Sequence, residues 1–152
     1  MRSTWGEFKN SAPEMASIGE RRLSGRIAYL ATLKVDGSPR LHPVRPYIGG
    51  GHLYIFIDQN SPKGNDLRDD GRYALHCGMK ELNGLNDEFL VTGRAREVID
   101  IGIRQKSFKI TGHEVPDRYI LFEFFIDQVL LVKYDVDKKA MRWSWNFQDG
   151  ER

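Results

Sequence analysis

The sequence lacks the features of a disulfide-stabilised, exported or membrane-spanning protein. Its 152 residues contain a single cysteine, Cys77, which has no second thiol to pair with. A lone thiol suits a reducing compartment. The N-terminus has no apolar core of the signal-peptide kind, and no apolar run approaches the ~20 residues of a membrane helix. We therefore expect a cytoplasmic protein with no membrane partner.

The sequence also lacks an excess of charge of either sign. It has 23 basic and 21 acidic residues, a formal net charge of +2, and the two kinds are interspersed. A nucleic-acid-binding domain is expected to concentrate its basic residues on one face, so we expect no nucleic-acid partner. The basic pair Arg21–Arg22 follows Glu20 and is interpreted as the solvated end of a helix.

Signatures of a metal site or of a catalytic triad are missing as well. No two of the four histidines stand four residues apart, so we expect no bound metal. Cys77 lies within an apolar strand and is predicted to be a small buried side chain rather than a nucleophile. The sequence identifies no catalytic residues. Without repeats or linker-like stretches, residues 1–152 are expected to form a single domain.

The first 23 residues are predicted to be helical. Thr4–Glu7 fits a capping box, in which a hydroxyl and a carboxylate satisfy free backbone donors, and Ser11–Glu14 fits a second one. A proline is tolerated in the first turn of a helix but not in its interior. We therefore expect a short helix, a break near Pro13, and a second helix that ends at about Arg22.

Short segments of β-favouring residues separated by turns dominate the rest of the chain. Asp36–Gly37 is typical of a hairpin turn, and Asp127–Gln128 is predicted to bend a long strand. Consecutive hairpins pair in antiparallel fashion, and closing into a barrel removes open sheet edges. We therefore predict a mainly β protein, a six-stranded antiparallel split barrel with attached helices. The predicted strands are 26–35, 39–47, 52–58, 72–78, 88–98 and 119–134; helices are expected at 61–70 and 100–109, and a last short strand at 141–147.

The segment Ser61–Gly64 has the composition of an anion-binding helix start. Ser61 is a good N-cap residue, and Pro62 suits the first helical position. Free backbone N–H groups and the positive end of the helix dipole gather there, and Lys63 adds a full charge. Gly64 lets a ligand approach the backbone closely. An ordinary capped helix with an exposed lysine would have the same sequence, and this alternative remains open.

A second candidate group lies on the predicted strand 39–47. Arg40 and His42 are two residues apart, so they share one face of the strand. If this strand neighbours 52–58, either side chain reaches the same anion as Lys63. Pro43 keeps the strand from pairing fully, which frees backbone groups for the polar edge of a heterocycle. The alternative is that both residues lie on the solvent side of the strand.

The end of the chain is rich in aromatic residues, with Trp143 and Trp145 two residues apart. Two tryptophans in a disordered tail would expose much apolar area, so we expect them to pack. Their own core, a partner subunit or a flat cofactor ring are all possible contacts.

Several of these segments together resemble the pyridoxamine 5'-phosphate oxidase-like family of split-barrel flavin proteins. The resemblance extends from about residue 5 to 134, and it depends on the order and spacing of the motifs rather than on any one of them. The segments that carry it are 26–33, 36–44, 52–56, 61–68, 72–76 and 89–95.

The resemblance implies a homodimer with one flavin mononucleotide (FMN) in each of two grooves at the interface. By matching position, Ser61 and Lys63 would hold the phosphate, with Arg40 or His42 assisting. Trp143 or Trp145 would close the groove, in the same subunit or the partner. The residues that would line the flavin ring are His42, Pro43, Val44, Phe56, Ile57 and Asp58.

The sequence departs from the oxidase itself at two points. Pro62 stands where the oxidase has the first of two adjacent basic residues, and the arginine-bearing substrate motif near the oxidase C-terminus is not evident. The resemblance thus implies a flavin-dependent oxidoreductase acting on another small molecule. The alternatives are a relative that uses a deazaflavin coenzyme, a flavin- or haem-binding module without turnover, and a structural dimer with an empty groove.

Overall fold

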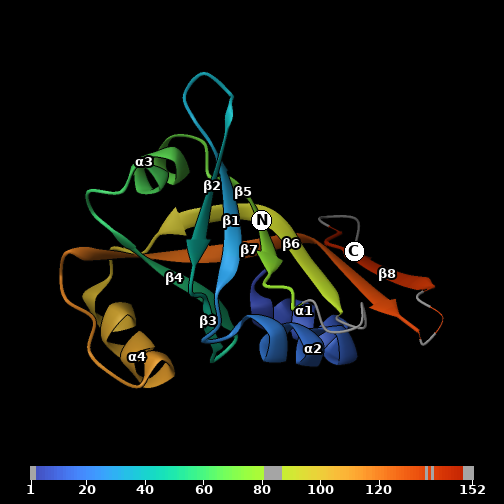
Figure 1. The fold of residues 1–152 in the computed structure, drawn as a ribbon. Coiled ribbons are helices and arrows are strands. Elements are labelled where there is room, and N and C mark those ends of the chain that lie inside the picture. The colour runs from blue at the N-terminus through green and yellow to red at the C-terminus, as the bar shows by residue number, and fades with distance from the viewer. Residues whose placement is uncertain (1–2, 81–86, 136, 138, 149–152) are drawn as a thin grey trace.

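The computed structural model describes residues 3–80, 87–135, 137 and 139–148. Two helices come first in the chain and two more lie between groups of strands, and Figure 1 shows the helices arranged around one curved sheet. The helices are α1 (Trp5–Ser11), α2 (Pro13–Leu23), α3 (Pro62–Asp69) and α4 (Ile101–Thr111). The strands are β1 (Ala28–Leu33), β2 (Pro39–Val44), β3 (Tyr47–Gly49), β4 (His52–Asp58), β5 (Arg72–Cys77), β6 (Glu88–Glu97), β7 (Tyr119–Tyr134) and β8 (Ala140–Asn146).

The N-terminal helices confirm one of the two predicted capping boxes. The Thr4 hydroxyl accepts a hydrogen bond from the Glu7 backbone, and the Glu7 side chain bonds back to the Thr4 backbone. The second box is wrong: α2 has Ala12 at its N-cap and no capping side chain. Ser11 is instead the last residue of α1, and Pro13 at the start of α2 has no N–H that needs a cap.

All strand pairs are antiparallel, and the strands form one sheet in the order β2-β1-β5-β6-β7-β4-β3. β8 pairs with the second half of β7, beside the stretch of β7 that pairs with β4. The mainly β architecture is confirmed. The sheet has eight strands rather than six: the predicted strand 39–47 is divided at Arg45 and Pro46 into β2 and β3, and β8 is the last short strand expected at 141–147.

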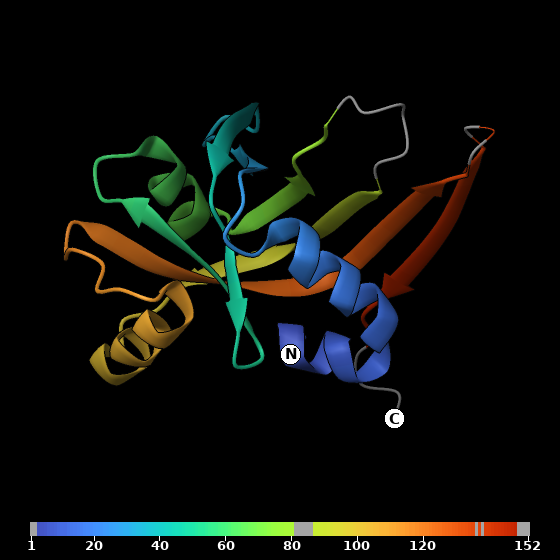
Figure 2. The same ribbon diagram turned by 60° about the horizontal axis from the view of Figure 1, so that its bottom comes forward.

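The two outermost strands of the seven-strand path are consecutive in the chain. β2 ends at Val44 and β3 begins at Tyr47, so only Arg45 and Pro46 join opposite edges of the sheet. The three peptide units from Val44 to Tyr47 span at most about 11 Å. The sheet must therefore curl until these edges approach each other, which produces the open half-barrel seen in Figures 1 and 2.

A bulge in β7 strengthens this curl. Thr92 of β6 pairs with Gln128, but the next residue, Gly93, pairs with Ile126, so Asp127 is the extra residue. The bend predicted at Asp127–Gln128 is thus confirmed, since a residue left out of the pairing bends its strand and increases the local twist.

The inner surface of the half-barrel is filled by one hydrophobic core. Fully buried aromatic side chains come from both layers: Trp5 and Phe8 from α1, Phe89 from β6, and Phe122 and Phe124 from β7. In Figure 2, α1 and α2 lie together below the sheet, whereas α3 and α4 lie near its other end. α3 packs beside β1 and β4, and its Asp66 side chain contacts Arg40 of the edge strand β2.

Candidate cofactor-binding site

The start of α3 has the predicted proline at its first position but not the predicted serine cap. Ser61 occupies the N-cap position with an extended backbone, yet its side chain makes no capping bond. The Ser61 hydroxyl instead accepts a hydrogen bond of 2.8 Å from Nζ of Lys63. The first turn of α3 thus has no side-chain cap. Pro62 has no N–H and the Gly64 N–H donates to the Ser61 carbonyl across 3.2 Å, so the Lys63 N–H is the first-turn backbone donor that has no hydrogen bond to a described residue and can bind an anion.

Arg40 of β2 is held against α3 by a buried carboxylate. Its Nε donates to Oδ2 of Asp66 across 2.7 Å, and the Thr32 hydroxyl donates to the same oxygen across 2.7 Å. Thr32 lies opposite Arg40 in the β1–β2 register, so both side chains point to the same face. Among the described residues, no other acceptor bonds to the Arg40 guanidinium, which leaves its two terminal nitrogens available.

The positive groups of β2 and α3 lie close enough to influence one another. Burial, followed by the charges of Lys63 and Arg40, lowers the pKa of His42 from its usual value. Burial also lowers the pKa of Lys63, and Arg40 lowers it further, whereas Asp58 raises it. Arg40, His42 and Lys63 therefore belong to one cluster, as the sequence suggested. On the sequence alone, the strand of Arg40 could lie beside 52–58, but β2 does not pair with β4. It is α3 that brings the groups together.

Asp58 lies at the end of β4, just before this turn. Its Oδ1 accepts a hydrogen bond of 2.9 Å from the Asn60 backbone, and its Oδ2 lies 3.8 Å from Nε of Arg118. With Asp66, this carboxylate balances the two permanent positive charges of the cluster. The cluster therefore offers directed donors rather than an excess of positive charge.

Three other predicted ring-lining residues turn away from this cluster. The Ile57 and Val44 side chains are buried in the core, with 1% and 7% of their surfaces exposed. The Phe56 ring lies 6.4 Å from that of Phe108 on α4, and the Arg104 guanidinium lies over it. At these three positions, only the backbone N–H and C=O groups are available to contact a ligand at the cluster.

Gly64 and Pro43 are also placed by the fold. Gly64 is buried, and a side chain there would point toward Ile57 at an ordinary contact distance, which gives this glycine a place against the core. Pro43 is exposed on the outer face of β2, where it lies opposite Tyr29 of β1.

The two tryptophans of β8 are separated from the cluster within one chain. Trp145 packs on α1: its ring lies 5.0 Å from that of Phe8, and its Nε1 donates to the Ser11 hydroxyl across 2.9 Å. Trp143 points the other way and is 41% exposed. Figures 1 and 2 both show β8 at the opposite end of the molecule from α3. Trp145 thus uses the own-core contact that the sequence left open.

The sequence did not single out Asp66 or Thr32, the two residues that fix Arg40. The one available signal is that Asp66 stands beside Leu67 on the inward side of α3, where a carboxylate needs a partner. Within the described residues no group of three or more histidine, cysteine or acidic side chains is arranged to hold a metal ion. None of the described helices is long and apolar enough to cross a membrane.

Solved structures of other proteins share this fold. No protein-family model matches the sequence, and no curated protein is significantly similar to it. A NimC/NimA family protein from Clostridium acetobutylicum superposes with a TM-score of 0.66 and 15% identity, covering 93% of this chain and 95% of that one. A candidate pyridoxamine 5'-phosphate oxidase from Listeria innocua gives 0.63 and 15%, covering 78% and 95%. A haem-binding protein from Mycobacterium smegmatis gives 0.65 and 16%, covering 86% of this chain but only 57% of that one.

The curled antiparallel sheet with its attached helices is therefore a split barrel. Its structural neighbours, among them a candidate pyridoxamine 5'-phosphate oxidase, share this fold, so the resemblance seen in the sequence is confirmed at the level of the fold.

Proposed function

We propose that this chain binds flavin mononucleotide and holds the cofactor phosphate at the start of α3. The observation that carries the proposal is the convergence of three kinds of donor on one point. They are the uncapped first turn of α3, the Lys63 amine, and the terminal nitrogens of Arg40. A helix N-terminus combined with a bidentate guanidinium and an amine suits a phosphate.

Each residue of the cluster has a separable part in this binding. Arg40 and Lys63 supply charge-assisted hydrogen bonds, and Asp66 with Thr32 fixes the direction of Arg40. His42 is kept uncharged at neutral pH by its lowered pKa, so it acts as a hydrogen-bonding group rather than as a third cation. Pro39 and Pro43 of β2 have no backbone N–H, so they donate no hydrogen bond to the ligand.

The position of β2 suits the ring portion of the same ligand. β2 pairs with β1 on one side only, so its other edge faces no hydrogen-bonded strand. Such an edge presents unpaired backbone groups, which are suitable partners for the polar edge of a heterocycle. A bound flavin supplies hydride and electron transfer, while the protein binds and orients it. The proposed activity is therefore a flavin-dependent oxidoreduction of a small molecule.

A homodimer forms part of the proposal, because the outer face of the β2-β1-β5 sheet is apolar. Leu41 is 67% exposed and Tyr29 is 45% exposed, and the register places Ala31 between Leu41 and Ala74 on the same face. An apolar face of this kind marks a site of association. A second copy of the chain would also bring another β8, with Trp143, toward the cofactor.

The absorption spectrum of the purified protein tests the cofactor. Absorbance near ~450 nm is expected for a bound flavin, and mass spectrometry of the released group should give flavin mononucleotide. The Lys63→Ala variant should bind FMN more weakly by ~1–3 kcal/mol, because it loses a charge-assisted contact. Lys106→Ala, an exposed lysine of α4, is the matched control. Equal affinity of Lys63→Ala and the parent would exclude the phosphate assignment.

The alternatives have their own signatures in the same experiments. A haem, the ligand named for the M. smegmatis neighbour, gives an intense Soret band instead of a flavin spectrum. A colourless protein stabilised against heat by a deazaflavin coenzyme, but not by FMN, would favour that cofactor. Absence of any stabilisation would leave a structural dimer.

A further inference from the structure

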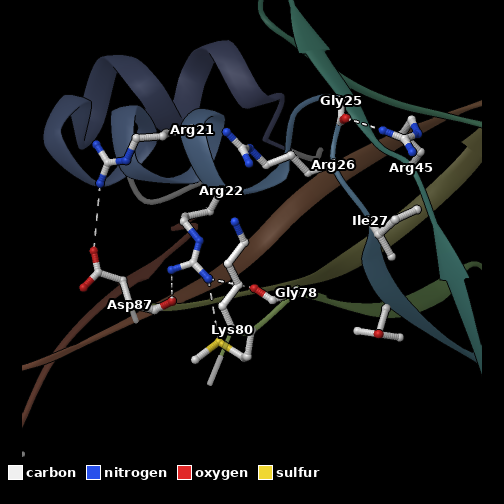
Figure 3. Close-up of a pocket in the computed structure, with 11 residues that line it drawn as sticks. Arg21, Arg22, Gly25, Arg26, Ile27, Arg45, Gly78, Lys80 and Asp87 are labelled. Carbon is white, nitrogen blue, oxygen red and sulfur yellow. Dashed lines mark hydrogen bonds and ion pairs between the residues drawn. The ribbon is translucent and has the colours of Figure 1, made fainter. Parts of the chain in front are cut away.

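A concave region lies at the other end of β2 from the α3 cluster, between the end of α2 and the end of β5. We name it the basic groove; it is defined by Arg21, Arg22, Arg26, Arg45, Lys80 and Asp87. The groove has a volume of about 740 Å³, within the ~300–1,000 Å³ typical of small-molecule sites. Figure 3 shows the side chains of Arg21, Arg22 and Arg26 extending from the end of α2 and the segment after it, with Asp87 and Lys80 facing them.

The arginines of the basic groove are anchored without being neutralised. The Arg22 guanidinium donates to the backbone carbonyls of Asp87 and Gly78, the latter at 2.7 Å. Arg45 donates to the backbone carbonyl of Gly25 across 2.5 Å. A carbonyl accepts a hydrogen bond but carries no net charge, so both guanidinium groups are held in place with their full positive charge.

Asp87 is the one carboxylate among the described residues that line the groove, and it compensates this charge poorly. Oδ2 of Asp87 lies 3.9 Å from the nearest Arg21 nitrogen, and the Arg21 side chain is 61% exposed. Arg26 makes no ion pair or hydrogen bond through its side chain with any described residue. The described lining of the groove thus has four arginines against one carboxylate, while the whole chain carries only +2. The positive charge is concentrated here and not spread over the surface.

The walls of the groove also offer apolar surface. Ile27, Tyr29 and Met79 line it and are 45%, 45% and 46% exposed. We propose that the basic groove binds a small molecule in which a carboxylate or phosphate group is attached to an apolar body. Arg26 and the anchored guanidinium groups bind the anion, and the apolar body packs against Ile27 and Met79.

The shape of the site favours a small molecule over a nucleic acid. A nucleic-acid surface needs a basic track that follows the phosphates over several nucleotides. Here the charge is confined to one hollow, and the chain outside the groove has slightly more acidic than basic residues. This inference concerns a different set of residues from the FMN proposal, and it does not require a flavin.

Titration calorimetry with phenyl phosphate and with benzoate, on the purified protein at low salt, tests the proposal. Both ligands should bind, and Arg26→Gln should weaken binding about tenfold through loss of a charge-assisted contact. Arg26 is exposed and makes no side-chain bond, so this variant should fold normally, which thermal melting verifies. Lys106→Gln removes the same charge from α4 and should retain the affinity.

Two results would overturn the proposal. Unchanged affinity in Arg26→Gln would show that the anion does not occupy the groove. Tighter binding of a single-stranded oligodeoxythymidine than of phenyl phosphate, lost in Arg26→Gln, would assign the groove to a nucleic acid.

Discussion

The Nε atom of Arg40 lies 2.7 Å from Oδ2 of Asp66, and this ion pair joins the edge strand β2 to helix α3. The Asp66 side chain is only 6% exposed, whereas that of Arg40 is 24% exposed. The carboxylate is therefore a buried anchor, and the guanidinium extends from it toward the start of α3. One contact thus holds the open edge of the half-barrel and directs a donor of the candidate phosphate site.

Asp66→Asn should destabilise the protein by about 2–3 kcal/mol. Removing one partner of a buried ion pair typically costs ~3–5 kcal/mol, and the partial exposure of Arg40 reduces this figure. The variant should also bind FMN more weakly, because Arg40 loses its orientation. Thr32→Val removes only one hydrogen bond to Asp66 and should cost about 1 kcal/mol. Urea denaturation measures both; equal costs would show that the ion pair contributes little.

Leu41→Glu should convert the proposed homodimer into a monomer. The side chain lies at the centre of the exposed apolar face of β2, and a carboxylate there would be desolvated in the interface. Size-exclusion chromatography with light scattering should show the mass of one chain instead of two. Val35→Glu, at an 89% exposed position in the β1–β2 turn, is the control and should remain dimeric. A dimeric Leu41→Glu variant would place the interface elsewhere.

His76→Gln should alter how the stability depends on pH. Hydrogen bonding with Cys77, assisted by Glu88 and opposed by burial, raises the pKa of His76 to about 9. Its usual value is about 6.5. Because the folded state binds the proton more tightly, the imidazolium stabilises the fold fully below pH 6.5, and this contribution is lost as the pH rises through 9.

The parent should therefore be more stable than His76→Gln at pH 6, by about 1 kcal/mol because a third of the side chain is exposed. Above pH 9 the two should be equally stable. Chemical denaturation across this range measures the difference, and His113→Gln, an exposed histidine after α4, controls for loss of an imidazole. A difference independent of pH would show that His76 does not titrate in this way.

The order of strands and turns was predictable because each depends on local composition. Asp36–Gly37 forms a turn and Asp127 forms a bulge for reasons contained in a few neighbouring residues. The site depended on longer-range geometry. The contact of Arg40 with Asp66 follows from the curl of the sheet, which is set by the two-residue link from β2 to β3. The periodicity of the sequence does not indicate that Arg40 and Asp66 come into contact.

The predictions that were wrong share one physical cause. In each case a polar side chain could form a hydrogen bond with any of several partners of similar chemistry. Ser61 was predicted to cap α3, but its hydroxyl binds the nearby Lys63 amine instead. Arg22 was interpreted as a solvated helix end, yet two backbone carbonyls hold it at the basic groove. Which partner a polar side chain takes is decided by the tertiary fold, since the energies of the alternatives differ little.

The bulge in β7 provides the sharpest test of the packing that curls the sheet. A Cβ atom at Gly93 would lie 2.1 Å from the carbonyl oxygen of Phe125, well inside contact distance. The obstructing atom belongs to the backbone of the paired strand, so it cannot turn aside as a flexible side chain does. Relief requires β6 and β7 to separate at the place where the register shifts.

Gly93→Ala should therefore destabilise the protein by about 2–4 kcal/mol, in the range of severe overpacking. Gly37→Ala is the matched control: its φ is +84°, but nothing lies within 4 Å of the added Cβ atom. It should cost only the ~1 kcal/mol of a left-handed alanine. Denaturant unfolding of both variants measures the difference. A Gly93→Ala variant as stable as Gly37→Ala would mean that β6 and β7 separate readily at the bulge, and that the curl does not depend on their close approach there.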